Sequence, residues 1–279
     1  MSDATPPAAP AESRRARRAP RRRRPVSVIG VFGEVLITGG VLVFLFIAWQ
    51  LWWNDLVVAG EQSSAANQIS QQWIDDAQAA SASATPTPTA TDTPTTAPTQ
   101  PAGFGTPVVA VAPAEAHPFA VLYVPRYGAA YSRTIAEGVG LNVLNSPRLG
   151  IGHYPGTQMP GEVGNFVVAA HRSANGGGMH LINELQLGDP IFVQTADGYY
   201  TYRFRDLEYV QPTDVGVLAA VPHVPGATAT DRLITLTSCN PLYSTAERII
   251  AYGVFDSWQP ISAGPPAELA AIIAAQAAG

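Results

Sequence analysis

The chain has 279 residues, and all sixteen of its basic residues are arginine, eight of them between Arg14 and Arg24. From Asp55 onward, 18 acidic residues stand against 8 arginines, which gives that part a formal charge of −10. The single cysteine excludes an internal disulfide, and together with five scattered histidines it shows no metal-ligand spacing, so we expect neither a metal nor a cofactor.

The N-terminal region contains an arginine-rich tail (residues 1–25) and then an apolar stretch (residues 26–53) whose only ionisable side chain is Glu34. A helix of that length crosses a hydrocarbon core of about 30 Å. We expect a single membrane-spanning helix, with the arginines holding the N-terminus in the cytoplasm and the rest of the chain outside the cell membrane. A signal peptide is one alternative, although no small-x-small cleavage site follows Trp53. Nucleic-acid binding by the arginines is another, and we favour the membrane over it.

Two segments of low apolar content follow. Residues 54–80 mix alanine and glutamine with scattered apolar residues, and we interpret them as a juxtamembrane stalk, with a poorly capped helix as the alternative. Residues 81–105 are almost wholly alanine, serine, threonine and proline. Such a tract buries too little apolar surface to offset its ordering entropy, so we expect a disordered spacer between membrane and folded domain.

Residues 106–260 contain short β-like runs separated by proline and glycine: AVLYVP, GNFVVAA, IFVQT, YYTYRF, LITLTSC and RIIAYGVF. The pattern predicts six to eight strands with only short helical pieces, such as 179–187, and favours an all-β barrel. A hairpin is predicted through Ala196-Asp197-Gly198, with Gly198 at positive φ.

Two further stretches have no predicted role in chemistry. The glycine-rich run at 174–179 lacks the Lys-Ser/Thr of a phosphate loop, so we expect a mobile loop there. Residues 261–279 form an alanine-rich tail, helical or frayed, whose apolar part is too short to cross a bilayer.

The run LITLTSC ends on Cys239. Strand alternation places the thiol at the end of one face, and Asn240-Pro241 ends the pairing because proline has no N–H for a ladder. If the following residues turn the chain back antiparallel, Arg248 lies across from Cys239. A guanidinium there can hold a carbonyl or an oxyanion and favour the thiolate.

His171 is the one histidine that directly follows a strand-like run, FVVAA, whereas most of the other four are expected on the surface or in loops. The sequence therefore predicts a thiol, an imidazole and a guanidinium around one groove, a set suited to nucleophilic catalysis. The alternative for Cys239 is a buried, inert thiol that packs as a small apolar group.

These motifs together resemble the sortases, bacterial cysteine transpeptidases with the strand motif TLxTC, an arginine opening the next strand and a histidine ending an earlier one. Here the motif is TLTSC, with Ser238 where the family usually has threonine. The resemblance covers about residues 118–258 and is greatest for class E, in which the stretch before the histidine looks like GIGHYPGTQMPGEVGNFVVAAHR. It implies a closed eight-stranded β-barrel.

The resemblance also implies a reaction in two acyl transfers. Cys239 attacks the Thr–Gly carbonyl of a C-terminal sorting signal, His171 gives and takes protons, and Arg248 binds the signal backbone and the oxyanion. The implied partners are secreted proteins that carry such a signal and a peptidoglycan precursor that supplies the amine. No cofactor is involved.

Class E sortases prefer an LAxTG signal over LPxTG. Tyr154 is our candidate for reading the variable second position, with simple loop packing as the alternative. Further candidates for substrate binding are Thr237 and Ser238.

Three other activities stay open. A pilin-polymerising sortase would use the same three residues, but the aromatic lid and C-terminal membrane helix usual in that class are not evident. A cysteine peptidase would hydrolyse the same thioacyl intermediate. A non-catalytic wall-binding domain would keep the anchor and the spacer and leave Cys239 inert.

Overall fold

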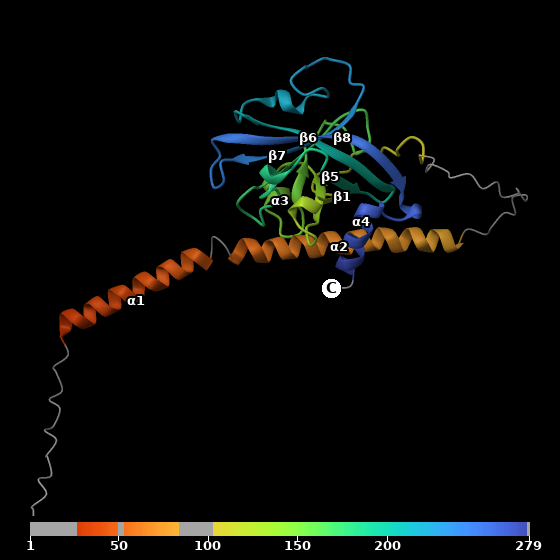
Figure 1. Ribbon diagram of the computed structural model, residues 1–279. Coiled ribbons are helices and arrows are strands. Elements are labelled where there is room, and N and C mark those ends of the chain that lie inside the picture. The colour runs from red at the N-terminus through yellow and green to blue at the C-terminus, as the bar shows by residue number, and fades with distance from the viewer. Residues whose placement is uncertain (1–26, 50–52, 84–102, 278–279) are drawn as a thin grey trace, which may run out of the picture. The chain divides into compact units, whose positions relative to one another are not determined.

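The computed structural model describes residues 27–49, 53–83 and 103–277 (Figure 1). The tail expected over residues 1–25 and most of the spacer expected over 81–105 lie outside the described residues. The chain forms two compact units, Met1–Phe46 and Ile47–Gly279, and the second contains the barrel.

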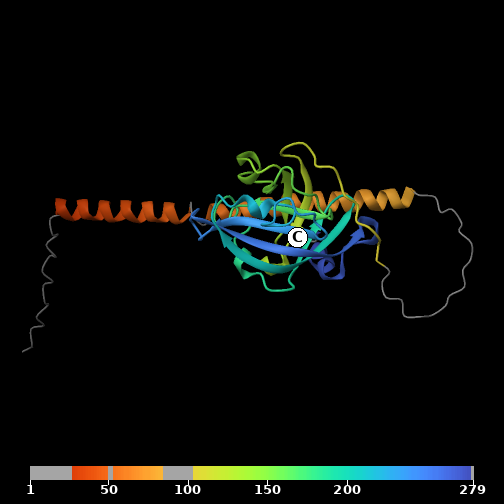
Figure 2. The ribbon, with the colours of Figure 1, turned by 90° about the horizontal axis from the view of Figure 1, so that it is seen from above.

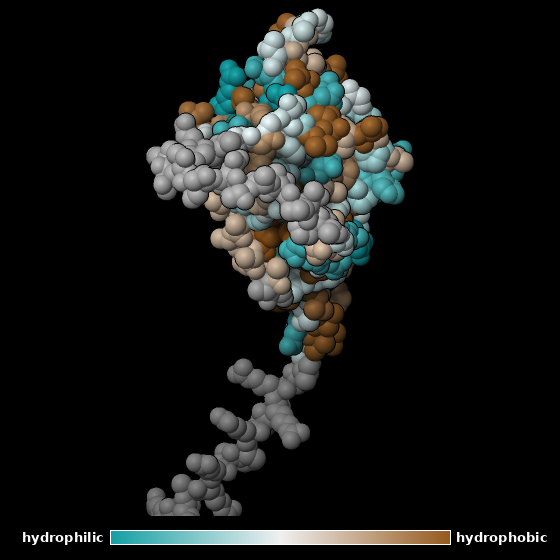
Figure 3. Space-filling view, turned by 90° about the vertical axis from the view of Figure 1, so that its right-hand side faces the viewer, coloured by the Kyte–Doolittle hydropathy of each residue, from teal (hydrophilic) through white to brown (hydrophobic). Residues whose placement is uncertain are grey.

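The first unit holds helix α1 (Val28–Ala48), which matches the apolar helix expected within residues 26–53. At 1.5 Å per residue its 21 residues extend over about 32 Å, and it is the one described helix long and apolar enough to cross a membrane. Its large apolar side chains are exposed, as the brown surface next to the grey N-terminal residues in Figure 3 shows.

Eight strands form a closed barrel, which confirms the predicted fold class. Their order around the barrel is β1-β2-β3-β4-β7-β8-β6-β5. The strands are β1 (Pro118–Tyr123), β2 (Arg133–Glu137), β3 (Gly150–His153), β4 (Gly164–Ala170), β5 (Pro190–Gln194), β6 (Gly198–Val210), β7 (Arg232–Asn240) and β8 (Glu247–Pro260). Two pairings, β2 with β3 and β4 with β7, are parallel, and the others are antiparallel.

The barrel interior is filled by one face of each strand. In β7, Ile234 and Leu236 belong to this core, whereas Thr235 and Thr237 lie on the outer face, as the alternation predicted. Aromatic side chains of β6 supply much of the volume: Tyr200, Tyr202 and Phe204.

The β5–β6 hairpin is present, but Gly198 does not take the positive φ that we expected. A glycine is needed there for another reason, because a Cβ would meet the carbonyl oxygen of Gln259 and the ring of Trp258 in β8.

Helical pieces within the barrel are short. They are α3 (Leu141–Leu144) and the 3₁₀ turns η2 (Pro125–Tyr127), η3 (Ile182–Glu184), η4 (Val215–Leu218) and η5 (Ile261–Ala263). The helical piece expected over residues 179–187 is only the turn η3.

The segment interpreted as a stalk, with a helix as the alternative, is a 30-residue helix, α2 (Asn54–Ser83), that packs along the outside of the barrel (Figures 1 and 2). Its fully buried side chains are small or polar, and the apolar side chains Ile69, Trp73 and Ile74 pack partly buried beside them. The buried residues are Gln62, Ala65, Ala66 and Ser70.

A second apolar cluster lies between the outer barrel wall, α2 and the C-terminal helix α4 (Ala267–Ala277). The alanine-rich tail is therefore helical and packed, with Leu269 and Ile273 buried. A buried amide joins the layers, because Gln194 Oε1 accepts hydrogen bonds from Ser70 Oγ at 2.7 Å and Tyr123 Oη at 2.9 Å. The folded domain thus comprises α2, the barrel and α4.

Candidate active site

The thiol and the guanidinium are brought together by the β7–β8 ladder. Cys239 is the register partner of Arg248, one residue pair before the strands part. Partners in an antiparallel ladder have Cβ atoms about 5 Å apart, so both side chains leave the same face of the sheet. The prediction that Arg248 lies across from Cys239 is confirmed by this register.

Both side chains are only half-buried, so a substrate can reach them. Arg248 Nη1 donates to the carbonyl oxygens of Thr245 and Glu247, at 3.1 and 3.0 Å. These bonds hold the guanidinium from the side of the β7–β8 loop. Within the described residues, its Nε and Nη2 have no protein acceptor, which leaves donors for a ligand.

His171 lies at the same end of the barrel because β4 and β7 run parallel. The register pairs Ala169 of β4 with Thr237 of β7. Two residues after each of them stand His171 and Cys239, so these two residues lie side by side at the strand ends. Ser238 Oγ donates to the carbonyl of Ala170 at 2.7 Å and fixes the two strand ends together.

The imidazole of His171 is held by a side chain from another loop. Its Nε2 lies 2.8 Å from Oδ1 of Asn145, which follows α3. An amide oxygen only accepts, so Nε2 carries the proton and Nδ1 is left for exchange. Burial lowers the pKa of His171, and the carboxylate of Asp55 at the start of α2 opposes this shift. The imidazole is therefore neutral more readily than an exposed histidine.

A partly buried network of polar side chains around Arg172 links the same strand ends. Arg172 donates to Oδ1 of Asn240 and, at 3.0 Å, to Oδ1 of Asn183. Asn240 in turn donates to Glu247 at 2.9 Å. Sequence reasoning missed this network, although the polar residues flanking His171 and Cys239 were a signal for it.

Tyr154 lies near the thiol and the guanidinium. Burial raises the pKa of its phenol, the nearby Arg248 lowers it, and the Cys239 thiol raises it. The side chain of Tyr154 is half-buried and lies within electrostatic range of both groups.

The other two candidates differ from each other. Thr237 lies on the same strand face as Cys239 but is only 5% exposed. Ser238 is 3% exposed, faces the barrel core, and gives its hydroxyl proton to Ala170. The serine hydroxyl thus has a structural contact where a ligand contact was expected.

A buried histidine–glutamate contact next to Tyr154 was also missed. His153 is fully buried, contrary to the surface or loop position expected for most histidines, and its Nδ1 lies 2.6 Å from Glu137 Oε2. Its Nε2 lies 2.9 Å from Thr157 Oγ1, and Thr157 donates to the carbonyl of Tyr154 at 2.8 Å. The pair therefore supports the loop that carries Tyr154.

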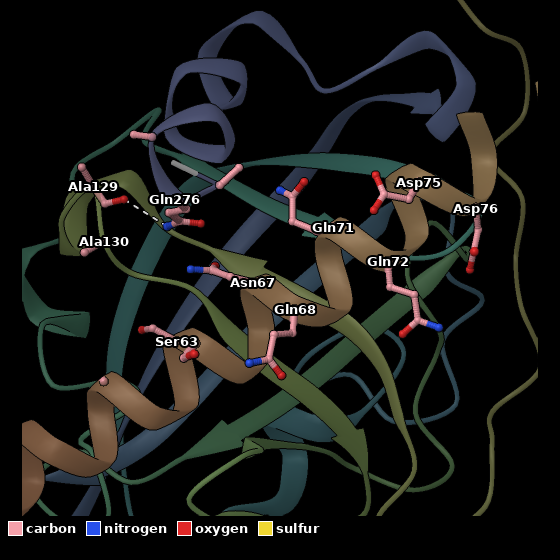
Figure 4. Close-up of a pocket in the computed structure, with 14 residues that line it drawn as sticks. Ser63, Asn67, Gln68, Gln71, Gln72, Asp75, Asp76, Ala129, Ala130 and Gln276 are labelled. Atoms are coloured by element: carbon pink, nitrogen blue, oxygen red, sulfur yellow. Dashed lines mark hydrogen bonds between the residues drawn. The ribbon is translucent and has the colours of Figure 1, made fainter. Parts of the chain in front are cut away.

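A wide groove lies away from these residues. It has a volume of about 980 Å³ and runs between α2, residues 129–130 and the end of α4, where Gln276 donates to the carbonyl of Ala129 at 3.1 Å (Figure 4). None of the six predicted site residues lines it. Among the residues described, no group of three or more His, Cys, Asp or Glu side chains could hold a metal ion.

The match to known proteins agrees with this geometry. The family model described as "Sortase domain" matches residues 122–256. Sortase SrtE1 of Streptomyces coelicolor is 31% identical over 269 residues, which cover 93% of this chain and 67% of the relative. Sortase SrtE2 of the same organism is 29% identical over 258 residues, 89% of this chain and 92% of the relative.

Solved structures give the same picture. The SrtA sortase from Actinomyces oris has a TM-score of 0.55 and 35% identity, over 59% of this chain and 94% of that one. Sortase E1 from Streptomyces coelicolor, solved with a tripeptide in its active site, has a TM-score of 0.50 and 36% identity, over 55% of this chain and 96% of that one. Both curated relatives, SrtE1 and SrtE2, are class E sortases.

Proposed function

We propose, because this chain belongs to the sortase family of cysteine transpeptidases, that it cleaves a C-terminal sorting signal between threonine and glycine and joins the acyl part to a peptidoglycan amine. The observation that carries the proposal is the register pair of Cys239 and Arg248 beside the strand end that bears His171. These three are the proposed catalytic residues.

In the first step, Nδ1 of His171 takes the proton of the Cys239 thiol, the thiolate attacks the threonine carbonyl carbon, and the carbonyl π electrons move to oxygen. The guanidinium donors of Arg248 stabilise that oxyanion. The intermediate collapses to a thioester, and the C–N bond breaks as the glycine nitrogen takes a proton from His171.

In the second step, an amine attacks the thioester carbonyl, His171 takes the proton from the amine, and the Cys239 thiolate leaves. We place the proton transfers at Nδ1, and the contact of His171 Nε2 with Asn145 supports this choice. The same group therefore serves as acid and then as base.

The preferred signal is LAxTG, with Tyr154 contacting its second residue. The position of Tyr154 beside Cys239 and Arg248 supports this role, and a related sortase binds a tripeptide in its active site. Thr237 and Ser238 complete the proposed substrate contacts, Thr237 by its side chain and Ser238 by its backbone, since its hydroxyl is bonded to Ala170.

The enzyme acts outside the cell membrane. Helix α1 supplies one span, and the arginine-rich residues before it keep the N-terminus in the cytoplasm by the positive-inside rule. Secreted proteins with a sorting signal and a peptidoglycan precursor are both present on that side.

The test is a transfer assay with the full-length protein in detergent. Peptides containing LAxTG or LPxTG are incubated with triglycine or a diaminopimelate-containing amine, and the products are identified by mass spectrometry. We expect an amine-linked product, more from LAxTG than from LPxTG, and none with Cys239→Ala. If cleavage occurs at the same rate with and without the amine and gives only free acid, the enzyme is a hydrolase.

A further inference from the structure

One side chain of α2 reaches through to the loops around His171. Gln62 is fully buried, and its Nε2 donates to the carbonyl oxygens of Ser146 at 2.9 Å and Asn175 at 3.0 Å. Both acceptors are backbone carbonyls, so the orientation of the amide is fixed, with both N–H groups in use.

Two glycines make room for this amide. A Cβ at Gly150 would lie 2.5 Å from Gln62 Nε2, and a Cβ at Gly176 would lie 2.7 Å from Gln62 Oε1. Both glycines also have positive φ, 88° and 85°. The glycine-rich stretch at 174–179, where we expected a mobile loop, therefore packs against the Gln62 side chain of α2. Gly176 leaves the space that this side chain occupies.

The two carbonyls belong to the two loops that meet at the imidazole. Ser146 directly follows Asn145, whose Oδ1 contacts His171 Nε2 at 2.8 Å. Asn175 lies four residues after His171 and donates through Nδ2 to the same Oδ1 at 3.1 Å. Gln62 thus joins the backbones of two loops whose asparagine side chains meet at Asn145 Oδ1, the atom that contacts His171.

We infer that Gln62 is a positioning residue for the transpeptidase reaction, acting through Asn145 on His171. The inference rests on the proposed role of His171 as acid and base. It makes the juxtamembrane helix part of the catalytic unit, since the helix next to the membrane span supplies the bond that sets the imidazole.

The chemistry explains why an amide is required. Without its two N–H groups, two partly buried carbonyls lose their donors and the loops are free to separate. Asn145 then no longer holds Nε2–H, and Nδ1 is misaligned with the scissile nitrogen. A displacement of about 1 Å in a catalytic group can lower a rate by about 10²-fold.

The test compares Gln62→Met, which keeps the length and removes both donors, with Gln68→Met, the same change on the exposed face of the same helix. Full-length variants in detergent are assayed with an LAxTG peptide and triglycine. For Gln62→Met we expect kcat to fall between about 10-fold and 100-fold with little change in KM, and for Gln68→Met we expect wild-type values.

A double-mutant cycle separates positioning from general destabilisation. If Gln62 acts through Asn145, Gln62→Met adds little to the kcat loss of Asn145→Ala, whereas independent effects multiply. Melting temperatures are measured for every variant. If Gln62→Met does not fold, Gln62→Asn takes its place, because its shorter amide cannot reach both carbonyls.

The inference is overturned if the folded Gln62 variant has the kcat of the Gln68 control, or if its loss multiplies with that of Asn145→Ala. Failure of the proposed function is a different result, because then the wild-type protein itself gives no Cys239-dependent turnover. The two failures are therefore distinguishable in one set of assays.

Discussion

The two halves of the active site are built by different means. Cys239 and Arg248 are placed by a continuous antiparallel ladder, whose backbone bonds fix their register. His171 lies just beyond the end of β4, and it is oriented by side chains from elements far away in the sequence, Asn145 and, through it, Gln62. One half depends on the sheet, and the other depends on loops held by α2.

The difference predicts where the site tolerates change. The ladder half should stay in place whenever the barrel folds, so that substitutions there act on the chemistry alone. The histidine half should lose its alignment by small displacements that leave the barrel intact. Substitutions around His171 should therefore lower activity without lowering the stability of the barrel.

The largest effect is expected in the ladder half. Arg248→Lys should lower kcat/KM by about 10²- to 10³-fold, because lysine keeps the charge but loses the planar fork of donors at the oxyanion. The melting temperature should hardly change. Arg205→Lys, on the exposed side of β6, is the control. Equal activity of the two variants would mean that Arg248 acts only through its positive charge and not through its hydrogen-bond donors.

The next effect concerns the whole of α2. A chain shortened to begin at Gly105 loses Gln62, the alanines that cover the outer wall and the Ser70 partner of Gln194. We expect its melting temperature to fall by about 10 °C and its peptide activity to fall at least as far as for Gln62→Met. A stalk would have had neither effect.

The control for that deletion removes only the spacer. A chain that lacks residues 84–102 keeps α2 and should match the wild type on peptides in solution. If the chain beginning at Gly105 is fully active instead, α2 contributes nothing to the groove.

These outcomes show which features the sequence could predict. The pairing of Cys239 with Arg248 was predictable because it needs only strand alternation and one turn between neighbouring strands. Strands β2 and β3 were missed because, at 5 and 4 residues, they are too short to show a period. These two segments form strands because they pair with neighbouring strands, and their own side-chain pattern does not indicate a strand.

The packing of α2 was not predictable for a different reason. Its fully buried residues, such as Ala66 and Ser70, are small or polar and give only a weak apolar pattern. Its key contact is an amide that fits two glycines more than eighty residues away. Such contacts depend on the tertiary structure of both partners. The same holds for Asn145, which no motif marks out.

A smaller effect is expected at Asn145. Asn145→Ala should lower kcat by as much as Gln62→Met, between about 10-fold and 100-fold, because the imidazole loses the acceptor that orients it and fixes its tautomer. Asn142→Ala, on the exposed side of α3, should behave as wild type. NMR of ¹⁵N-labelled histidine should show His171 changing from one tautomer to a mixture. An unchanged tautomer would show that Asn145 does not fix the protonation of the His171 ring.

The smallest effect concerns pH. Burial lowers the pKa of His171 and Asp55 partly offsets this, so Asp55→Asn should lower the pKa further while keeping an oxygen that can accept from Gly176. A histidine whose pKa is depressed by folding is protonated less readily in the folded state. Its cost to stability is absent above the ordinary value of about 6.5 and grows as pH falls toward the folded value.

In Asp55→Asn the loss of stability that begins below the ordinary histidine pKa should therefore continue to a lower pH. The melting temperature at pH 8 should be unchanged. The pKa is followed by NMR titration of the imidazole, with Asp76→Asn, exposed further along α2, as the control. The β7–β8 ladder is held by its own backbone bonds, so the positions of Cys239 and Arg248 should not change in Asp55→Asn. A shift of equal size in both variants would show that the field of the whole helix, and not the Asp55 carboxylate, acts on the histidine.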